Sequence, residues 1–158
     1  MKNVFYKWFY CAALALTIGP AFAADSSYAS VATDSLTPAR TLIAEKKWGS
    51  AIDELKRVNE TRSANWNNLM GYSLRKGPAP ELEAAERYYN EALRIEPKHR
   101  GALEYSGELY LMKGDLAKAE QRLAQLDKAC FMPCEEHSNF KQAMQKFKSN
   151  GNKYVASP

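Results

Sequence analysis

The chain has 158 residues, of which 46% are hydrophobic and 25% are charged, with 8 glycines and 7 prolines. This composition indicates a soluble, folded, helix-leaning protein of one domain. It excludes disordered, collagen-like and multi-span membrane chains. The net charge is +4. Without Lys2 and Lys7, which lie in the N-terminal segment described next, 20 basic residues face 18 acidic ones. That surplus is too weak to indicate a nucleic-acid-binding surface.

Residues 1–23 have the pattern of a secretory signal peptide. Two lysines precede an uncharged, largely apolar run at residues 8–18, and residues 21–23 (AFA) have the small-x-small pattern of a cleavage site. Eleven helical residues span about 16 Å, which is short of the roughly 30 Å of a bilayer core. We therefore predict cleavage after Ala23 and no stable membrane insertion afterwards. The expected location is the periplasm, with secretion as the alternative.

The remaining chain has the apolar spacing of a series of helices. Residues 24–36 are small and polar and predict a flexible lead-in. Residues 37–148 then place apolar side chains at helical intervals, and no stretch alternates with the period of a strand. Residues 149–158 have no periodicity and predict a disordered tail. The helices expected in chain order cover about 37–47, 50–58, 63–76, 80–95, 100–113, 115–126 and 135–147, with Thr37, Ser63 and Asp115 near their starts.

Similar segments return every 34 residues. Ala51, Ala85 and Ala119 stand 34 residues apart, and each is followed one turn later by a large side chain. Gly71 and Gly107 stand 36 residues apart, which is the same period with a two-residue insertion in the intervening turn. Small residues let two helices approach closely. A single helix pair cannot bury its apolar faces alone, so this pattern predicts pairs that stack.

This pattern resembles the tetratricopeptide repeat (TPR) family. The resemblance implies an all-α fold: a right-handed α-solenoid of about three antiparallel helix hairpins with a C-terminal capping helix. The first unit departs from the family pattern at Ala39 and Lys46, where glycines are usual. The residues of the best unit are Leu103, Ser106, Gly107, Tyr110, Gly114, Asp115, Leu116, Ala119, Leu123 and Leu126. The implied units cover about 32–63, 64–99 and 100–133, and the cap covers 134–148.

In the TPR family, the first helix of each pair lines a groove that binds an extended peptide or a helix of a partner. Leu69 and Tyr105 stand where the carboxylate clamp of chaperone-binding members has Asn and Arg, so that activity is not carried over. We predict a non-catalytic periplasmic adaptor or scaffold that binds a protein or peptide, without nucleic acid and without a cofactor. The alternative is a homo-oligomer that forms by self-association. The groove positions carried onto this sequence are Asn65, Asn68, Tyr72, Arg75, Glu104, Tyr105, Glu108 and Met112.

Signal cleavage would remove Cys11 and leave two cysteines, Cys130 and Cys134. An even pair in an oxidising compartment predicts a disulfide, which here would close a five-residue loop and contribute roughly 2 kcal/mol. The less favoured alternative is a metal or redox site made of these cysteines and His137, although a fourth ligand is lacking. We expect His99 and His137 to be solvated surface residues. Neither has a nearby nucleophile and orienting acid that would indicate an enzyme.

Overall fold

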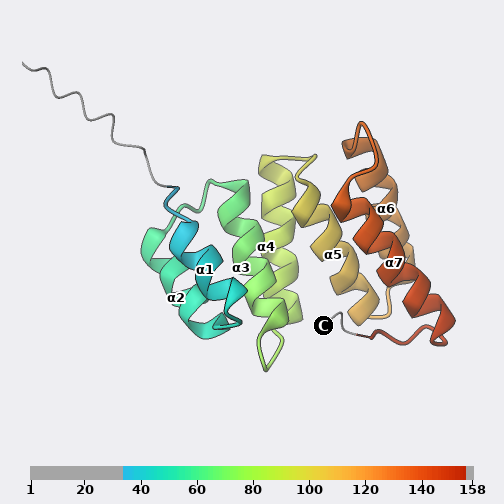
Figure 1. Ribbon diagram of the computed structural model, residues 1–158, viewed down its shortest axis with the longest axis horizontal. Coiled ribbons are helices and arrows are strands. Elements are labelled where there is room, and N and C mark those ends of the chain that lie inside the picture. Colours follow the sequence, from blue (N-terminus) through green and yellow to red (C-terminus); the bar gives the residue numbers. More distant parts are fainter. Residues whose placement is uncertain (1–33, 156–158) are drawn as a thin grey trace, which may run out of the picture. The chain divides into compact units, whose positions relative to one another are not determined.

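The computed structural model describes residues 34–155, and this part of the chain is all-helical, as the sequence predicts. The predicted signal peptide and most of the predicted lead-in lie outside the described residues. Within residues 34–155, no helix combines the length and the apolar character needed to cross a bilayer. The helices are α1 (Thr37–Ala44), α2 (Trp48–Val58), α3 (Ala64–Lys76), α4 (Leu82–Ile95), α5 (Arg100–Met112), α6 (Leu116–Ala129) and α7 (Glu135–Ser149) (Figure 1).

Each helix packs against the next one along the chain (Figure 1). The odd-numbered helices also contact one another, α1 with α3, α3 with α5, and α5 with α7. Among the described residues, the backbones of α2, α4 and α6 do not approach one another in this way, although Arg122 of α6 donates a hydrogen bond to Asn90 of α4 at 2.9 Å. The odd-numbered helices therefore form one layer, and the even-numbered helices flank it.

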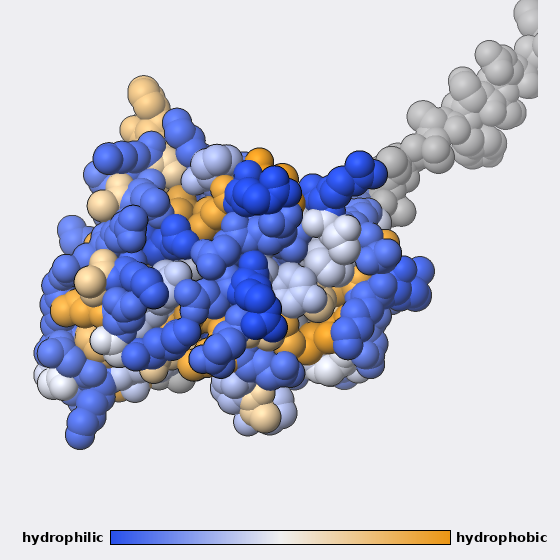
Figure 2. Space-filling view, turned by 180° about the vertical axis from the view of Figure 1, so that it is seen from behind, coloured by the Kyte–Doolittle hydropathy of each residue, from blue (hydrophilic) through white to orange (hydrophobic). Residues whose placement is uncertain are grey.

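The burial pattern of the helices follows from these two layers. The even-numbered helix α4 buries one stripe, formed by Ala85, Tyr89 and Ala92 at intervals of four and three residues. The odd-numbered helices α3 and α5 are buried around most of their circumference, because neighbours lie on both sides of each. Figure 2 shows the opposite face to that of Figure 1, where hydrophilic side chains surround scattered hydrophobic patches.

Two helix starts follow the sequence prediction closely. The Ser63 hydroxyl accepts a hydrogen bond from the Trp66 N–H at 3.3 Å, and the Asp115 carboxylate accepts one from the Lys118 N–H at 3.1 Å. These side chains satisfy backbone donors that have no partner inside the helix.

The start of α1 differs from the prediction. Thr37 is the first residue of the helix and not its cap, and Leu36 occupies the cap position without a side-chain hydrogen bond. Leu36 is only 2% exposed and packs in a cluster with Leu55 and Trp66. The folded part of the chain therefore begins before residue 37, because an apolar side chain in the predicted lead-in has a core to enter.

Two glycines permit close helix contacts, but they face different neighbours. A Cβ atom added to Gly71 would lie 2.8 Å from the Tyr89 ring of α4, and one added to Gly107 would lie 2.1 Å from the Phe140 ring of α7. Real Cβ contacts are not this short. Gly107 therefore allows α7 to lie directly against α5, with the Phe140 ring completely buried.

The Cys130–Cys134 disulfide is present, as predicted, and it joins the end of α6 to the start of α7. Beyond α7, the chain differs from the predicted disordered tail. Gly151 and Asn152 have positive φ angles of 65° and 59°, which turn the chain back after the helix (Figure 1). Tyr154 is then partly buried against the main hydrophobic cluster. An aromatic ring near the end of the chain therefore packs although its segment has no helical periodicity.

Candidate functional site

A pocket of about 410 Å³ lies where α3, α5 and α7 meet. Five of the eight groove residues predicted from the sequence line it, so the structure brings together side chains from two predicted units. The third wall, from α7, was not predicted. The lining residues are Tyr72, Arg75 and Lys76 from α3, Glu104, Tyr105 and Glu108 from α5, and Asn139, Gln142 and Lys146 from α7.

The other three predicted residues do not line this pocket. Asn65 is exposed and its side-chain oxygen lies 3.0 Å from Nε2 of His99. Asn68 is 7% exposed, and its amide nitrogen packs close to Gly101 at the start of α5. Met112 places its sulfur 3.9 Å from a guanidinium nitrogen of Arg75. All three residues lie on α3 or α5, as the sequence predicts, but none of them is among the residues that line the pocket.

An ion pair forms the base of the pocket. Nη1 of Arg75 donates to Oε2 of Glu108 at 2.7 Å, and Nε donates to the hydroxyl of Tyr89 at 3.3 Å. Burial lowers the pKa of Arg75, but Tyr89 and Glu108 outweigh burial and raise the pKa above its usual range. Arg75 is 2% exposed, and its guanidinium already has partners within the protein. Arg75 therefore orders the base of the pocket and offers little surface to a ligand.

Two tyrosines stand beside this ion pair. The ring centroids of Tyr72 and Tyr105 are 4.5 Å apart, and the guanidinium of Arg75 lies 5.6 Å from each of them. Trp48, the first residue of α2, packs edge-on against Tyr72 at 5.9 Å. Burial raises the pKa of both tyrosines, so their hydroxyl groups stay protonated at neutral pH. The result is a fixed aromatic wall with hydroxyl groups that can donate hydrogen bonds.

Glu104 is a buried carboxyl group in this pocket, with 5% exposure. Burial raises its pKa to about 8, and the negative charge of Glu108, one turn later on α5, adds to this effect. A hydrogen bond with Asn139 acts in the opposite direction. Because a protonated carboxyl group has both a donor and an acceptor, Glu104 can recognise a neutral polar group at neutral pH.

Helix α7 supplies the third wall because Gly107 lets it approach α5. Phe140 enters the space at Gly107, and the adjacent Asn139 thereby comes within hydrogen-bonding reach of Glu104. Asn139, Gln142 and Lys146 are spaced i, i+3 and i+7 and so lie on one side of α7. This polar stripe is visible in the sequence. The sequence does not predict its place in the pocket, because that place depends on the packing of Phe140 at Gly107.

The rim of the pocket contains the side chains of Lys76 and Lys146. Burial lowers the pKa of Lys76, and the nearby charge of Arg75 lowers it further. Tyr154, in the C-terminal segment, also reaches Arg75. Burial raises the pKa of Tyr154, while the charge of Arg75 and a hydrogen bond with it act in the opposite direction. Arg75 at the base of the pocket therefore also interacts with the C-terminal segment.

The expectation of a solvated surface histidine is wrong for His99. This residue is 9% exposed, and its Nδ1 accepts a hydrogen bond from the Ala102 N–H at 3.0 Å at the start of α5. That bond makes Nε2 the protonated nitrogen, which donates to the Asn65 side chain. Burial lowers the pKa of His99. His99 was missed because a histidine cap is less common than one made by Ser, Thr, Asp or Asn.

His137 is partly buried, and its Nε2 lies 3.7 Å from Oδ1 of Asp127. The sulfur atoms of Cys130 and Cys134 are bonded to each other. Among residues 34–155, no group of three or more His, Cys, Asp or Glu residues is arranged to hold a metal ion. The structure therefore does not place these cysteines and this histidine together as a set of ligands.

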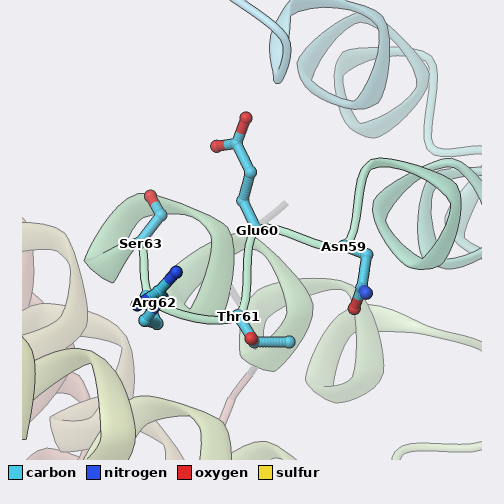
Figure 3. Close-up of a pocket in the computed structure, with 5 residues that line it drawn as sticks. All are labelled: Asn59, Glu60, Thr61, Arg62 and Ser63. Atoms are coloured by element: carbon cyan, nitrogen blue, oxygen red, sulfur yellow. The ribbon is translucent and has the colours of Figure 1, made fainter.

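A second hollow, of about 440 Å³, lies on the turn between α2 and α3 (Figure 3). Five consecutive residues, 59–63, line it. Figure 3 shows that their side chains point in different directions, with Glu60 directed away from Asn59 and Thr61. A shallow hollow without convergent side chains does not have the geometry of a binding site.

A comparison of the chain with protein-family models, with curated proteins and with solved structures finds no match in any of the three. The chemistry of the pocket between α3, α5 and α7 is therefore the basis of the function proposed below.

Proposed function

We propose that this protein is a non-catalytic periplasmic adaptor that holds an extended segment of a partner protein in the pocket between α3, α5 and α7. In this proposal the helix pairs are TPR-type units that stack into a right-handed solenoid, and the odd-numbered helices form its inner face. The contacts among α1, α3, α5 and α7 support this arrangement. The 34-residue repeat in the sequence supports it independently.

The observation that carries the proposal is the set of side chains around the pocket. Two packed tyrosines, two amides and a buried carboxyl group converge on it from three helices. Asn139 and Gln142 can pair with the N–H and C=O groups of an extended peptide, which need partners when they leave water. The rings of Tyr72 and Tyr105 offer contact area with little loss of conformational entropy, a property typical of interface tyrosines.

The charges favour a segment that is polar and not strongly basic. Arg75 and Glu108 neutralise each other at the base, and Glu104 carries a proton at neutral pH because its pKa is about 8. The exposed lysine Lys146 then adds a positive charge to the pocket lining. A partner segment with a neutral or acidic side chain complements this surface better than a basic one.

Site-specific photocrosslinking in intact cells tests the proposal. A photoreactive residue in place of Gln142, which lies in the pocket, should crosslink to a partner protein. The same residue in place of Gln121, which is also exposed but lies on α6, serves as the matched control. We expect the Gln142 adduct to be specific and to weaken in a Tyr105→Ala background.

Equal crosslinking from the two positions would contradict the proposal. Adducts that contain only a second copy of the chain would contradict it as well, because they would indicate self-association. Circular dichroism of the Tyr105→Ala variant shows whether a loss of crosslinking reflects a loss of fold.

A further inference from the structure

The C-terminal segment, residues 150–155, returns to the helices after α7. It contains no helix or strand, and the turn at Gly151 and Asn152 reverses the direction of the chain. In Figure 1 the segment then runs back from the end of α7 and passes beneath the end of α5. Its Tyr154 side chain packs against the main hydrophobic cluster and makes a hydrogen bond with Arg75 of α3. The segment therefore reaches from α7 to α3.

Tyr154 meets Arg75 at the base of the pocket between α3, α5 and α7. Tyr72 and Glu108, which line the same pocket, also interact electrostatically with the Tyr154 hydroxyl group and so lie close to it. A side chain from the end of the chain is thus placed beside three of the residues that form the pocket. Tyr154 therefore occupies space at the base that a partner segment could otherwise enter.

The C-terminal segment has the properties that the proposed function requires of a partner segment. Its backbone is not in a helix or strand, its side chains include the amides of Asn150 and Asn152, and it carries one aromatic ring. Its single charged side chain, Lys153, is exposed and stays in water. In the free chain, the pocket is therefore already in contact with a segment of the kind that it is proposed to bind.

From this geometry we infer that the C-terminal segment is an internal ligand of the pocket, which the partner segment displaces when it binds. Because this concerns the regulation of the same site, the inference rests on the function proposed above. A segment tethered a few residues from its site has an effective concentration on the order of millimolar. A partner binds only the fraction of chains whose segment is released, so its apparent affinity is reduced by that fraction.

The segment can leave the pocket while the helices stay folded. Tyr154 is the one residue of 151–155 that is not exposed. The backbone hydrogen bond from the Asn152 N–H to the Phe147 carbonyl, at 3.0 Å, stays at the end of α7 and does not involve α3 or α5. Segments with few buried contacts open locally, at a lower free energy than global unfolding. Release of the segment therefore requires mainly the loss of the contacts of one side chain.

Release also leaves the base of the pocket intact. Arg75 donates to Glu108 at 2.7 Å and to the Tyr89 hydroxyl at 3.3 Å, so its charge keeps partners when Tyr154 leaves. A buried charge left without a partner would instead make release costly. The Tyr154 hydroxyl is solvated once the segment is released. The structure thus combines a docked segment with a low cost of displacement.

Fluorine nuclear magnetic resonance of the chain without residues 1–23, with fluorotyrosine placed only at position 154, tests docking without any partner. We expect its resonance to differ from that of an unfolded tyrosine, and to move there at urea concentrations that do not yet change the far-ultraviolet circular dichroism. A resonance at the unfolded position without urea would overturn the inference, because the segment would not be docked. A resonance that moves only together with the circular dichroism would overturn it too, because the segment would be a permanent part of the fold.

Photocrosslinking from position 142 in intact cells then tests displacement. The yield of the adduct is compared between wild type, Tyr154→Ala, Tyr154→Phe and Val155→Ala. The last variant changes an exposed side chain next to Tyr154 and is the matched control. Because a hydrogen bond to a charged group changes docking about tenfold, Tyr154→Ala should raise the yield by about three- to tenfold, and Tyr154→Phe should raise it by less. Val155→Ala should leave the yield unchanged.

Yields from Tyr154→Ala and Tyr154→Phe that equal or fall below that of wild type would contradict displacement. Circular dichroism of the variants identifies any loss of fold, and Tyr154→Phe keeps the packed ring if Tyr154→Ala does not fold. The absence of adducts in every background would refute the proposed function itself, and displacement by a partner with it. The fluorine measurement still decides in that case whether the segment docks in the pocket.

Discussion

The buried carboxyl group of Glu104 makes a prediction that depends directly on the geometry of the pocket. Its pKa is about 8 in the folded protein and 4.5 is the ordinary value. Between these two pH values the folded state keeps a proton that the unfolded state has lost, so the free energy of unfolding falls as the pH rises. From the ordinary pKa of 4.5 to pH 7 is an interval of 2.5 pH units. At about 1.36 kcal/mol per unit, Glu104 lowers the free energy of unfolding by about 3 kcal/mol over this interval.

Glu104→Gln should remove this cost, because a glutamine amide is neutral at every pH and its oxygen can still accept a hydrogen bond from Asn139. Urea unfolding of both proteins at pH 5, 6, 7 and 8 measures the effect. We expect the variant to gain stability relative to wild type as the pH rises, by about 3 kcal/mol at pH 7. The charges that face Glu104, namely Glu108, Glu136 and Arg75, remain in both proteins, so their own contributions largely cancel in the difference.

Two stability curves that stay parallel from pH 5 to pH 8 would refute this account of Glu104. Its carboxyl group would then be solvated or paired with a cation in both states. Glu135→Gln removes an exposed carboxylate beside the Cys130–Cys134 disulfide and controls for the change in net charge alone.

Three further predictions concern the framework of the site. Gly107→Ala should lower the free energy of unfolding by about 1–3 kcal/mol, because its Cβ atom would lie 2.1 Å from a ring of α7. Gly49→Ala meets open space and should not lower the free energy of unfolding, so equal denaturant midpoints for the two variants would contradict this prediction. Arg75→Ala should lower the free energy of unfolding by about 3–5 kcal/mol, because it leaves the buried carboxylate of Glu108 unpaired. A loss below about 1 kcal/mol would show that the ion pair is not buried in solution. Thiol titration of the unfolded, unreduced chain without residues 1–23 should find no free thiol, and two free thiols would contradict the disulfide. Reduction of Cys130–Cys134 should lower the free energy of unfolding by about 2 kcal/mol.

The sequence predicted those features that depend on local pattern. Apolar spacing predicted an all-helical chain, and the pairing of two cysteines predicted the disulfide, and both are confirmed. Helical phase also placed Tyr72, Glu104 and Tyr105 on the helix faces that meet at the pocket. Such predictions succeed because the period of a helix fixes which residues share a face.

The features that were missed depend on contacts between helices. Nothing in the local pattern of α7 shows that Phe140 fills the space at Gly107, so the pocket contribution of Asn139 could not be predicted. The hydrogen-bond partner of the His99 Nε2 is Asn65, which lies 34 residues earlier. The packing of Leu36 depends on Leu55 and Trp66 in the same way. Each of these needs a tertiary partner that the sequence alone does not identify.

The central claim is that a partner segment lies in the pocket between α3, α5 and α7. The most direct measurement is a nuclear magnetic resonance titration. The isotope-labelled chain without residues 1–23 is titrated with the partner segment that crosslinks to position 142. The account predicts that the largest chemical-shift changes map to residues of that pocket, including Tyr72, Tyr105 and Asn139. Changes confined to the outward faces of α2, α4 and α6 would contradict it.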